Sequence, residues 1–93
     1  MTALEETNVA FSREAFRSYA TLAVNEPKAL KRINKLIEDI QRNGLLEGIG
    51  KPERLKYEDE ERYSRRIDEK NRLVYTLKDG ALFIVSCSGH YND

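Results

Sequence analysis

Apolar residues follow the period of a helix in the first half of the chain and that of strands in the second half. The clearest helical stripe comprises Leu30, Ile33, Leu36, Ile37 and Ile40. Charged residues occupy the other side, so the pattern predicts an amphipathic helix that begins near Pro27, with Asn25 as its cap, and ends at Asn43-Gly44. A shorter stripe predicts a preceding helix over residues 15–23, capped by Ser12 or a neighbour.

Short alternating runs outside these helices predict strands. Residues 8–12 can form a first strand, and several glycines with Pro52 mark a loop after the second helix. Three later strand candidates cover residues 63–67, 73–77 and 81–86. A polar turn joins the first two of these, and Lys78-Asp79-Gly80 joins the next two as a tight hairpin.

These elements predict a single α+β domain over residues 1–93, with an N-terminal helical hairpin packed on a mainly antiparallel twisted β-sheet. A chain of 93 residues at 40% hydrophobic can build one modest core. We expect residues 1–7 to form a loose leader. No apolar run approaches the ~18 residues of a membrane span, and the first residues lack the features of a secretory signal. We therefore expect a cytoplasmic protein with no membrane partner.

Charge is balanced overall but segregated locally. Sixteen basic and sixteen acidic residues cancel, which argues against a protein that coats nucleic acid through bulk charge. Residues 62–78 nevertheless hold six basic and two acidic residues, a net charge of +4, and residues 28–42 hold five and two, a net charge of +3. The acidic run at residues 58–61 lies between them. Any phosphate-binding surface is therefore expected to be local.

Cysteine and histidine are each present once, which is too few for an internal disulfide or a Cys/His zinc site. Cys87 follows an apolar run, so we interpret it as a small buried side chain and not as a nucleophile. Gly48-Ile49-Gly50-Lys51 is too short for a phosphate-binding fingerprint and is interpreted as a loop. We expect no metal and no cofactor.

Several polar residues can converge from loops and strands, namely Glu53, Lys56, Arg65, Arg66, Arg72, His90 and Tyr91. Such a set suits RNA cleavage, because the 2′-OH of the substrate is itself the nucleophile. The protein then supplies a base, an acid and fixed cations for the charge that grows on the phosphate. His90 is the one side chain whose unperturbed pKa, ~6.5, suits proton transfer near neutrality.

Four motifs follow one another over residues 50–91. They are Gly50-Lys51-Pro52-Glu53-Arg54-Leu55-Lys56, Tyr63-Ser64-Arg65-Arg66-Ile67, Asn71-Arg72-Leu73-Val74-Tyr75 and His90-Tyr91. In order and in spacing they resemble the GKPE-x-LK loop, the aromatic-SRRI strand, the x-RLVY strand and the terminal HY pair of the YoeB branch of the RelE-like toxin endoribonucleases. Each motif alone is a weak signal, but four in sequence make an accidental resemblance improbable.

The resemblance implies a RelE-like, microbial ribonuclease-like fold and an mRNA interferase activity. Such a toxin inhibits translation by cleaving mRNA in the ribosomal A site without a metal, through 2′-OH attack that leaves a 2′,3′-cyclic phosphate. The implied partners are a YefM/Phd-like antitoxin, the ribosome with its A-site mRNA, a second copy of the chain, and operator DNA through the antitoxin complex only.

The resemblance also implies roles for individual residues. Glu53 takes the place of the general base, Arg72 that of the phosphate-stabilising arginine, and His90 that of the general acid. Tyr91 takes the place of the aromatic that shapes the site near the substrate base. Basic residues that hold the RNA backbone or support the site fall at Lys56, Arg65 and Arg66.

Simpler interpretations remain open at this stage. Glu53 can be a solvated loop charge, and Arg72 a surface ion-pair partner of Asp68 or Glu69. The zero net charge and the residues Asn92-Asp93 after the His-Tyr pair depart from the family pattern, and we expect them to affect turnover more than fold. The alternative function is a non-cleaving, toxin-like binding module that forms an antitoxin complex acting in transcriptional repression.

Overall fold

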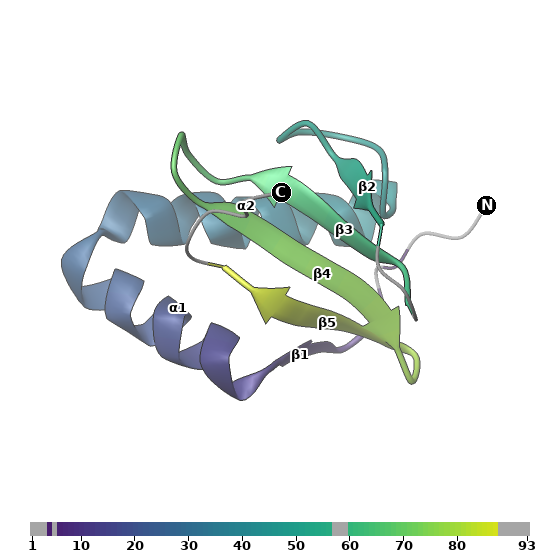
Figure 1. Ribbon diagram of the computed structural model, residues 1–93, viewed down its shortest axis with the longest axis horizontal. Helices are drawn as coiled ribbons and strands as arrows, with labels where there is room; N and C mark the ends of the chain where they lie inside the picture. The colour runs from purple at the N-terminus through teal and green to yellow at the C-terminus, as the bar shows by residue number, and fades with distance from the viewer. Residues whose placement is uncertain (1–3, 5, 57–59, 88–93) are drawn as a thin grey trace.

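Two helices and five strands make up the computed structural model, which describes residues 4, 6–56 and 60–87 of the chain. In chain order these elements are β1 (Val9–Phe11), α1 (Arg13–Asn25), α2 (Pro27–Asn43), β2 (Glu53–Leu55), β3 (Arg62–Arg66), β4 (Arg72–Lys78) and β5 (Ala81–Ser86). The strands form one twisted sheet, α2 runs along the face that lies at the back in Figure 1, and α1 packs against α2 and the edge formed by β1 and β5.

The sheet has the strand order β1-β5-β4-β3-β2. The strand β1 runs parallel to β5, and all other neighbours are antiparallel. The predicted α+β class with a mainly antiparallel sheet is therefore confirmed. Glu53 was expected in a loop, but it begins β2, an edge strand that pairs with β3. The three residues of β2 include one apolar side chain, Leu55, so no alternating pattern revealed this strand, and the sequence predicted only its neighbour β3.

Helix ends follow the expected capping chemistry at three of four positions. Ser12 caps α1 by accepting a hydrogen bond from the backbone N–H of Ala15 at 3.0 Å, and its own hydroxyl donates to the Val85 carbonyl at 2.9 Å. Pro27 is the first residue of α2, and Gly44 follows its last residue, as predicted. Asn25, in contrast, ends α1, and Glu26 occupies the cap position of α2.

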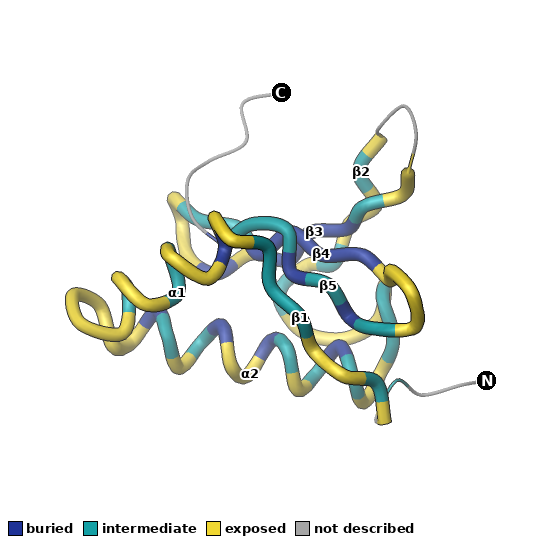
Figure 2. The backbone as a smooth tube through the Cα atoms, turned by 90° about the horizontal axis from the view of Figure 1, so that it is seen from below, coloured by how far each residue is buried: buried dark blue, intermediate teal, exposed yellow. Residues whose placement is uncertain are grey.

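The core lies between the apolar stripe of α2 and one face of the sheet (Figure 2). Its fully buried members include Ile33, Leu36 and Ile40 from α2 and Leu73, Tyr75, Leu82 and Ile84 from the sheet. Burying each aliphatic side chain of this size stabilises the fold by about 1.5–3 kcal/mol. The basic residues Lys28, Lys31 and Lys35 lie on the exposed side of α2, so this helix is amphipathic as predicted.

Part of the N-terminal leader is attached to α2. The Leu4 backbone N–H donates to the Gln41 carbonyl at 2.9 Å, and the Gln41 side-chain amide donates to the Thr7 carbonyl at 2.8 Å. Leu4 also packs against the core. The expectation of a loose leader over residues 1–7 is therefore wrong for Leu4 and Thr7, because Gln41 and the core offer them polar and apolar partners.

Candidate active site on the open face of the sheet

The sheet face opposite α2, here called the open face, brings Glu53, Ser64 and Arg72 together from three neighbouring strands. Glu53 pairs with Ser64, and Ser64 pairs with Val74, two residues after Arg72. The Arg72 guanidinium Nη1 donates to Glu53 Oε1 at 3.1 Å and to Ser64 Oγ at 3.2 Å. A carboxylate and a guanidinium that are 19 positions apart in the sequence thus meet on one surface.

The ion pair between Glu53 and Arg72 is accessible to solvent. The side chain of Glu53 is 59% exposed and that of Arg72 is 34% exposed. Such surface pairs contribute about 0–1 kcal/mol, so an incoming anion can compete with Glu53 for the guanidinium. Arg72 does not use the expected partners Asp68 or Glu69, because Asp68 accepts the backbone N–H groups of Lys70 and Asn71 in the β3–β4 turn.

A second arginine lies directly across from the first. Arg66, the last residue of β3, pairs with Arg72, the first residue of β4. Side chains opposite one another on antiparallel strands have Cβ atoms about 4.5–5.5 Å apart, and like charges at such positions are destabilising. Arg66 is exposed and has no ionic partner among residues 4, 6–56 and 60–87. Natural proteins keep unfavourable pairs of like charge mostly at functional sites. Two adjacent guanidinium groups are well suited to bind a phosphate.

Arg65 lies on the other side of β3 from Arg66, because successive side chains of a strand point to opposite faces. Its side chain is fully buried, and Nη1 forms an ion pair with Asp39 Oδ2 at 2.6 Å. An arginine in this position cannot hold an RNA backbone. The prediction that Arg65 contacts RNA is therefore wrong, and of the two roles that the family pattern allowed, support of the site is the one its surroundings fit.

The remaining predicted residues are not brought to the ion pair by the described part of the chain. Lys56 is exposed and lies beyond Leu55, which pairs with Arg62 at the far end of β3. His90 and Tyr91 lie outside the described residues. The strand β5 does end near the site, since Ser86 pairs with Val74.

The family model for the YoeB-like toxin of bacterial type II toxin-antitoxin systems matches residues 11–91 of the chain. The chain belongs to this family. The match spans both helices, the strands β2 to β5, the last residue of β1 and all seven predicted site residues, so the predicted family is confirmed.

Relatives of this YoeB-like toxin are similar to it in sequence over most of their length. The toxin YoeB of Synechocystis is 46% identical over 83 residues, which cover 89% of the chain and 95% of the relative. The toxin YoeB of Escherichia coli K12 is 41% identical over 81 residues, with 87% and 95% covered. Among solved structures, the YoeB dimer from Staphylococcus aureus superposes with a TM-score of 0.86 at 49% identity, covering 91% of this chain and 98% of that one.

Other solved structures extend the comparison. A YoeB-YefM complex from Staphylococcus aureus matches with a TM-score of 0.83 at 49% identity, again with 91% and 98% of the two chains covered. An archaeal RelE-RelB complex from Pyrococcus horikoshii matches with a TM-score of 0.68 at 11% identity, covering 94% and 98%. This last likeness concerns the fold alone, and it confirms the expected RelE-like architecture.

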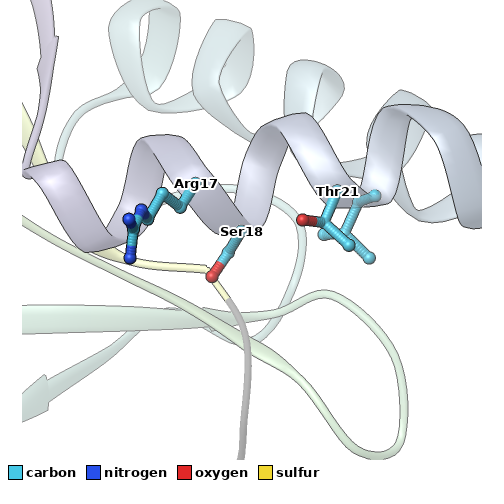
Figure 3. Close-up of a pocket in the computed structure, with 4 residues that line it drawn as sticks. Arg17, Ser18 and Thr21 are labelled. Atoms are coloured by element: carbon cyan, nitrogen blue, oxygen red, sulfur yellow. The ribbon is translucent and has the colours of Figure 1, made fainter.

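Two hollows on the described surface of this YoeB-like toxin lie away from the ion pair. One of about 270 Å³ is lined by Arg17, Ser18, Thr21 and Leu22, all from α1 (Figure 3). Another of similar volume includes Tyr63 and Thr76 in its lining but neither Glu53 nor Arg72. The described residues contain no group of three or more potential metal ligands and no helix that could cross a membrane.

Three residues of the YoeB-like site region escaped the sequence analysis. Ser64 anchors Arg72, while Asp39 and Tyr75 bind the buried Arg65. The alternation of a strand was a usable signal for Ser64, because it puts Ser64 and Arg66 on one face and Arg65 on the other. No local pattern pointed to Asp39, which lies on α2 among other charged residues, 26 positions before Arg65.

Proposed function

We propose that this toxin is a ribosome-dependent mRNA endoribonuclease, in which Glu53 is the general base and Arg72 stabilises the scissile phosphate. The carboxylate takes the proton of the substrate 2′-OH, whose oxygen attacks the adjacent phosphorus. The 5′-oxygen then leaves with a proton from a general acid, which gives a 2′,3′-cyclic phosphate and a new 5′-OH end. The nucleophile belongs to the substrate, so the scheme assigns no step to a metal or cofactor.

The contact of 3.1 Å between Glu53 and Arg72 carries this proposal. A base and an anion-stabilising group must reach neighbouring atoms of one nucleotide, because the 2′-OH lies next to the phosphate it attacks. When the phosphate occupies Arg72, the exposed Glu53 is released from its ion pair and remains within reach of the 2′-OH. A positioned base contributes about 10²–10⁴-fold to the rate, and a preorganised donor to the developing charge contributes about 10²–10³-fold.

Arg66 extends the anion site beside Arg72. Its position directly across the strand pair allows two guanidinium groups to hold one phosphate or two neighbouring ones. Lys56, exposed beyond the end of β2, is proposed to hold the RNA backbone farther along the strand.

His90 is proposed as the general acid that protonates the 5′-oxygen. It lies three residues after Cys87, and three extended residues span at most about 10 Å. That reach is sufficient to return from the end of β5 to the site, because Ser86 is paired with Val74 in the row next to Arg72. Tyr91 is proposed to stack on a base next to the cleaved bond, a contact that accepts any sequence.

The exposure of the ion pair supports a role for the ribosome. The side chain of Glu53 is 59% exposed and that of Arg72 is 34% exposed, and these two groups alone do not hold the 2′-OH in line with the leaving oxygen. A ribosome that presents the A-site codon in a fixed conformation would supply this geometry. The toxin is accordingly expected to act in the cytoplasm and to inhibit translation.

The solved relatives suggest protein partners. Staphylococcus aureus YoeB forms a dimer and a complex with YefM. We propose that this toxin likewise binds a YefM/Phd-like antitoxin and pairs with a second copy, and that it reaches operator DNA through the antitoxin complex only.

Primer extension on a defined mRNA tests the proposed reaction. Purified toxin is compared with His90→Ala, with and without ribosomes. We expect cuts inside the A-site codon that require both the ribosome and His90. A protein that binds its antitoxin tightly but leaves the ribosome-bound message intact would instead be the non-cleaving binding module, an alternative that the zero net charge of the chain favours.

A further inference from the structure

We propose that the ion pair between the buried Arg65 and Asp39 is a positioning device that fixes the loop of residues 44–50 and, through this loop, the catalytic Glu53. The inference rests on the proposed function, because the purpose of the device is to hold the general base. It concerns residues that touch neither RNA nor Glu53. Arg65 and Asp39 are therefore positioning residues.

Arg65 binds the loop through its backbone carbonyls. Nη2 donates to the carbonyls of Gly44 at 2.8 Å and Glu47 at 2.7 Å, and Nη1 donates to that of Ile49 at 3.0 Å. The remaining donors bind Asp39 Oδ2 and the Tyr75 hydroxyl, so all five N–H groups of the guanidinium are used. A buried cation with every donor satisfied fixes the loop in one arrangement, since any displacement leaves part of its charge unpaired.

Asp39 completes the attachment from α2. Its Oδ2 accepts the N–H of Ile49 at 3.0 Å in addition to the guanidinium, and its Oδ1 accepts the Asn43 amide at 2.8 Å. The loop is therefore held through both its carbonyl and its N–H groups at Ile49. A helix, a strand and a loop meet at this one ion pair.

Two glycines allow the loop to lie directly on the ion pair. Gly48 and Gly50 have φ angles of +117° and +85°, in the region that side chains disfavour. A Cβ atom at Gly48 would overlap Asp39 Oδ2 and lie 3.1 Å from Arg65 Nη1, and one at Gly50 would lie 2.8 Å from a methyl group of Leu36. The Gly48-Ile49-Gly50-Lys51 stretch thus has a structural reason that is unrelated to phosphate binding.

The loop transmits this fixation to Glu53 over a short path. The Gly50 carbonyl accepts the backbone N–H of Arg66 at 2.7 Å, which continues the attachment to β3. Lys51, with a φ of +52°, and Pro52 are the only residues between this bond and Glu53. The ring of Pro52 fixes its φ angle, which limits the freedom of this short connection. If the loop moved away from Arg65, the start of β2 would therefore move with it. Arg65 and Arg66 therefore serve one site from opposite faces of β3.

The test uses two variants and two matched controls in the full-length toxin. Asp39→Asn removes the charge and keeps the shape, and Gly48→Ala places a methyl group where Asp39 Oδ2 lies. Gly80→Ala is the control for backbone strain, because Gly80 also has a positive φ, +78°, but no atom within 4 Å of its added Cβ. Ile33→Val is the control for general loss of stability, since it removes one methylene from the core.

Two readouts separate positioning from folding. Single-turnover cleavage on ribosomes, corrected for the folded fraction, gives the rate of the chemical step, and its dependence on toxin concentration gives binding. We expect Asp39→Asn and Gly48→Ala to lower the chemical rate about 10–100-fold with binding changed less than about threefold, because misplacement of a catalytic group by about 1 Å costs a factor of this size. Both controls should cleave at the wild-type rate per folded molecule.

Amide hydrogen exchange of the free toxin provides the second readout and needs no cleavage. Exchange at Ile49 and over residues 53–55 should accelerate at least tenfold in Asp39→Asn and Gly48→Ala, relative to amides of β5, and in neither control. If the wild-type toxin does not cleave, the proposed function fails while this arm still decides whether the ion pair fixes the loop. Unchanged exchange, or equal loss of cleavage in Ile33→Val, would overturn the inference.

Discussion

The hydroxyl group of Tyr75 offers a direct measure of how strongly the buried arginine depends on its partners. It accepts a hydrogen bond from Arg65 Nε at 3.0 Å and donates one to the Leu45 carbonyl at 2.6 Å. Burial raises the pKa of Tyr75, so at neutral pH the phenol is protonated and can do both. The substitution Tyr75→Phe removes these two bonds and keeps the ring, which stacks on Tyr63 at a centroid distance of 5.8 Å.

The expected effect follows from the groups that lose their partner. One N–H of a buried guanidinium and one backbone carbonyl are left unsatisfied, and each such group costs about 1–3 kcal/mol. We therefore expect Tyr75→Phe to lower the free energy of unfolding by about 2–6 kcal/mol. Urea denaturation measures this change as a lower midpoint at an unchanged m-value.

Tyr63→Phe is the matched control, because Tyr63 and Tyr75 are paired across β3 and β4. Its hydroxyl donates to the carboxylate of Glu61, whose side chain is 64% exposed and can be hydrated when the bond is lost. We expect a loss below about 1 kcal/mol. The reasoning is refuted if Tyr75→Phe destabilises the toxin no more than Tyr63→Phe does.

Three further predictions follow from charge and burial. Burial raises the pKa of the Cys87 thiol to about 11, compared with 9.0 for a free thiol, so alkylation at pH 8 should be at least about 100-fold slower in the folded toxin than in urea. Burial alone would raise the pKa of Asp39, but hydrogen bonds from Arg65 and Ile49 and the charge of Arg65 hold it below the usual 3.8. The carboxylate therefore adds stability above pH 3.8 that is lost as the pH falls below this value, and urea midpoints between pH 2 and 6 should vary less in Asp39→Asn than in the wild type. Arg66→Gln removes a like-charge neighbour of Arg72, so the free energy of unfolding should stay equal or rise by up to about 0.5 kcal/mol. The slope of the logarithm of RNA affinity against the logarithm of salt concentration should become smaller in magnitude by about 0.7.

The helices and the long strands could be predicted because their signals are local. The stripe of α2 and the apolar runs of β4 and β5 extend over several turns or residues, and caps such as Ser12 act within three positions. The strand β2 could not be predicted, since Glu53-Arg54-Leu55 contains one apolar residue and owes its strand conformation to pairing with β3. The position of β2 beside β3 depends on the preceding loop of residues 44–50, which hydrogen bonds from Arg65 hold in place.

The candidate site shows the same division. Motif resemblance selected Glu53 and Arg72, and the structure places the two side chains in contact. The motif resemblance could not assign different roles to Arg65 and Arg66. A motif shows that two arginines are present, but not which face of the strand each one occupies. Strand alternation makes that division, and the ion pair with the largely covered carboxylate of Asp39, 17% exposed, explains why a cation can point into the core.

We propose that Glu53 and Arg72 form the cleavage centre. Single-turnover cleavage of an A-site codon on programmed ribosomes tests it with Glu53→Gln, Arg72→Gln and the control Glu60→Gln. Glu60 is also an exposed carboxylate in an ion pair, with Arg62 at 2.8 Å, but it lies outside the proposed centre. We predict that the first two variants bind ribosomes and cleave at least about 100-fold more slowly, while Glu60→Gln cleaves at the wild-type rate. Wild-type cleavage by Glu53→Gln would contradict the account.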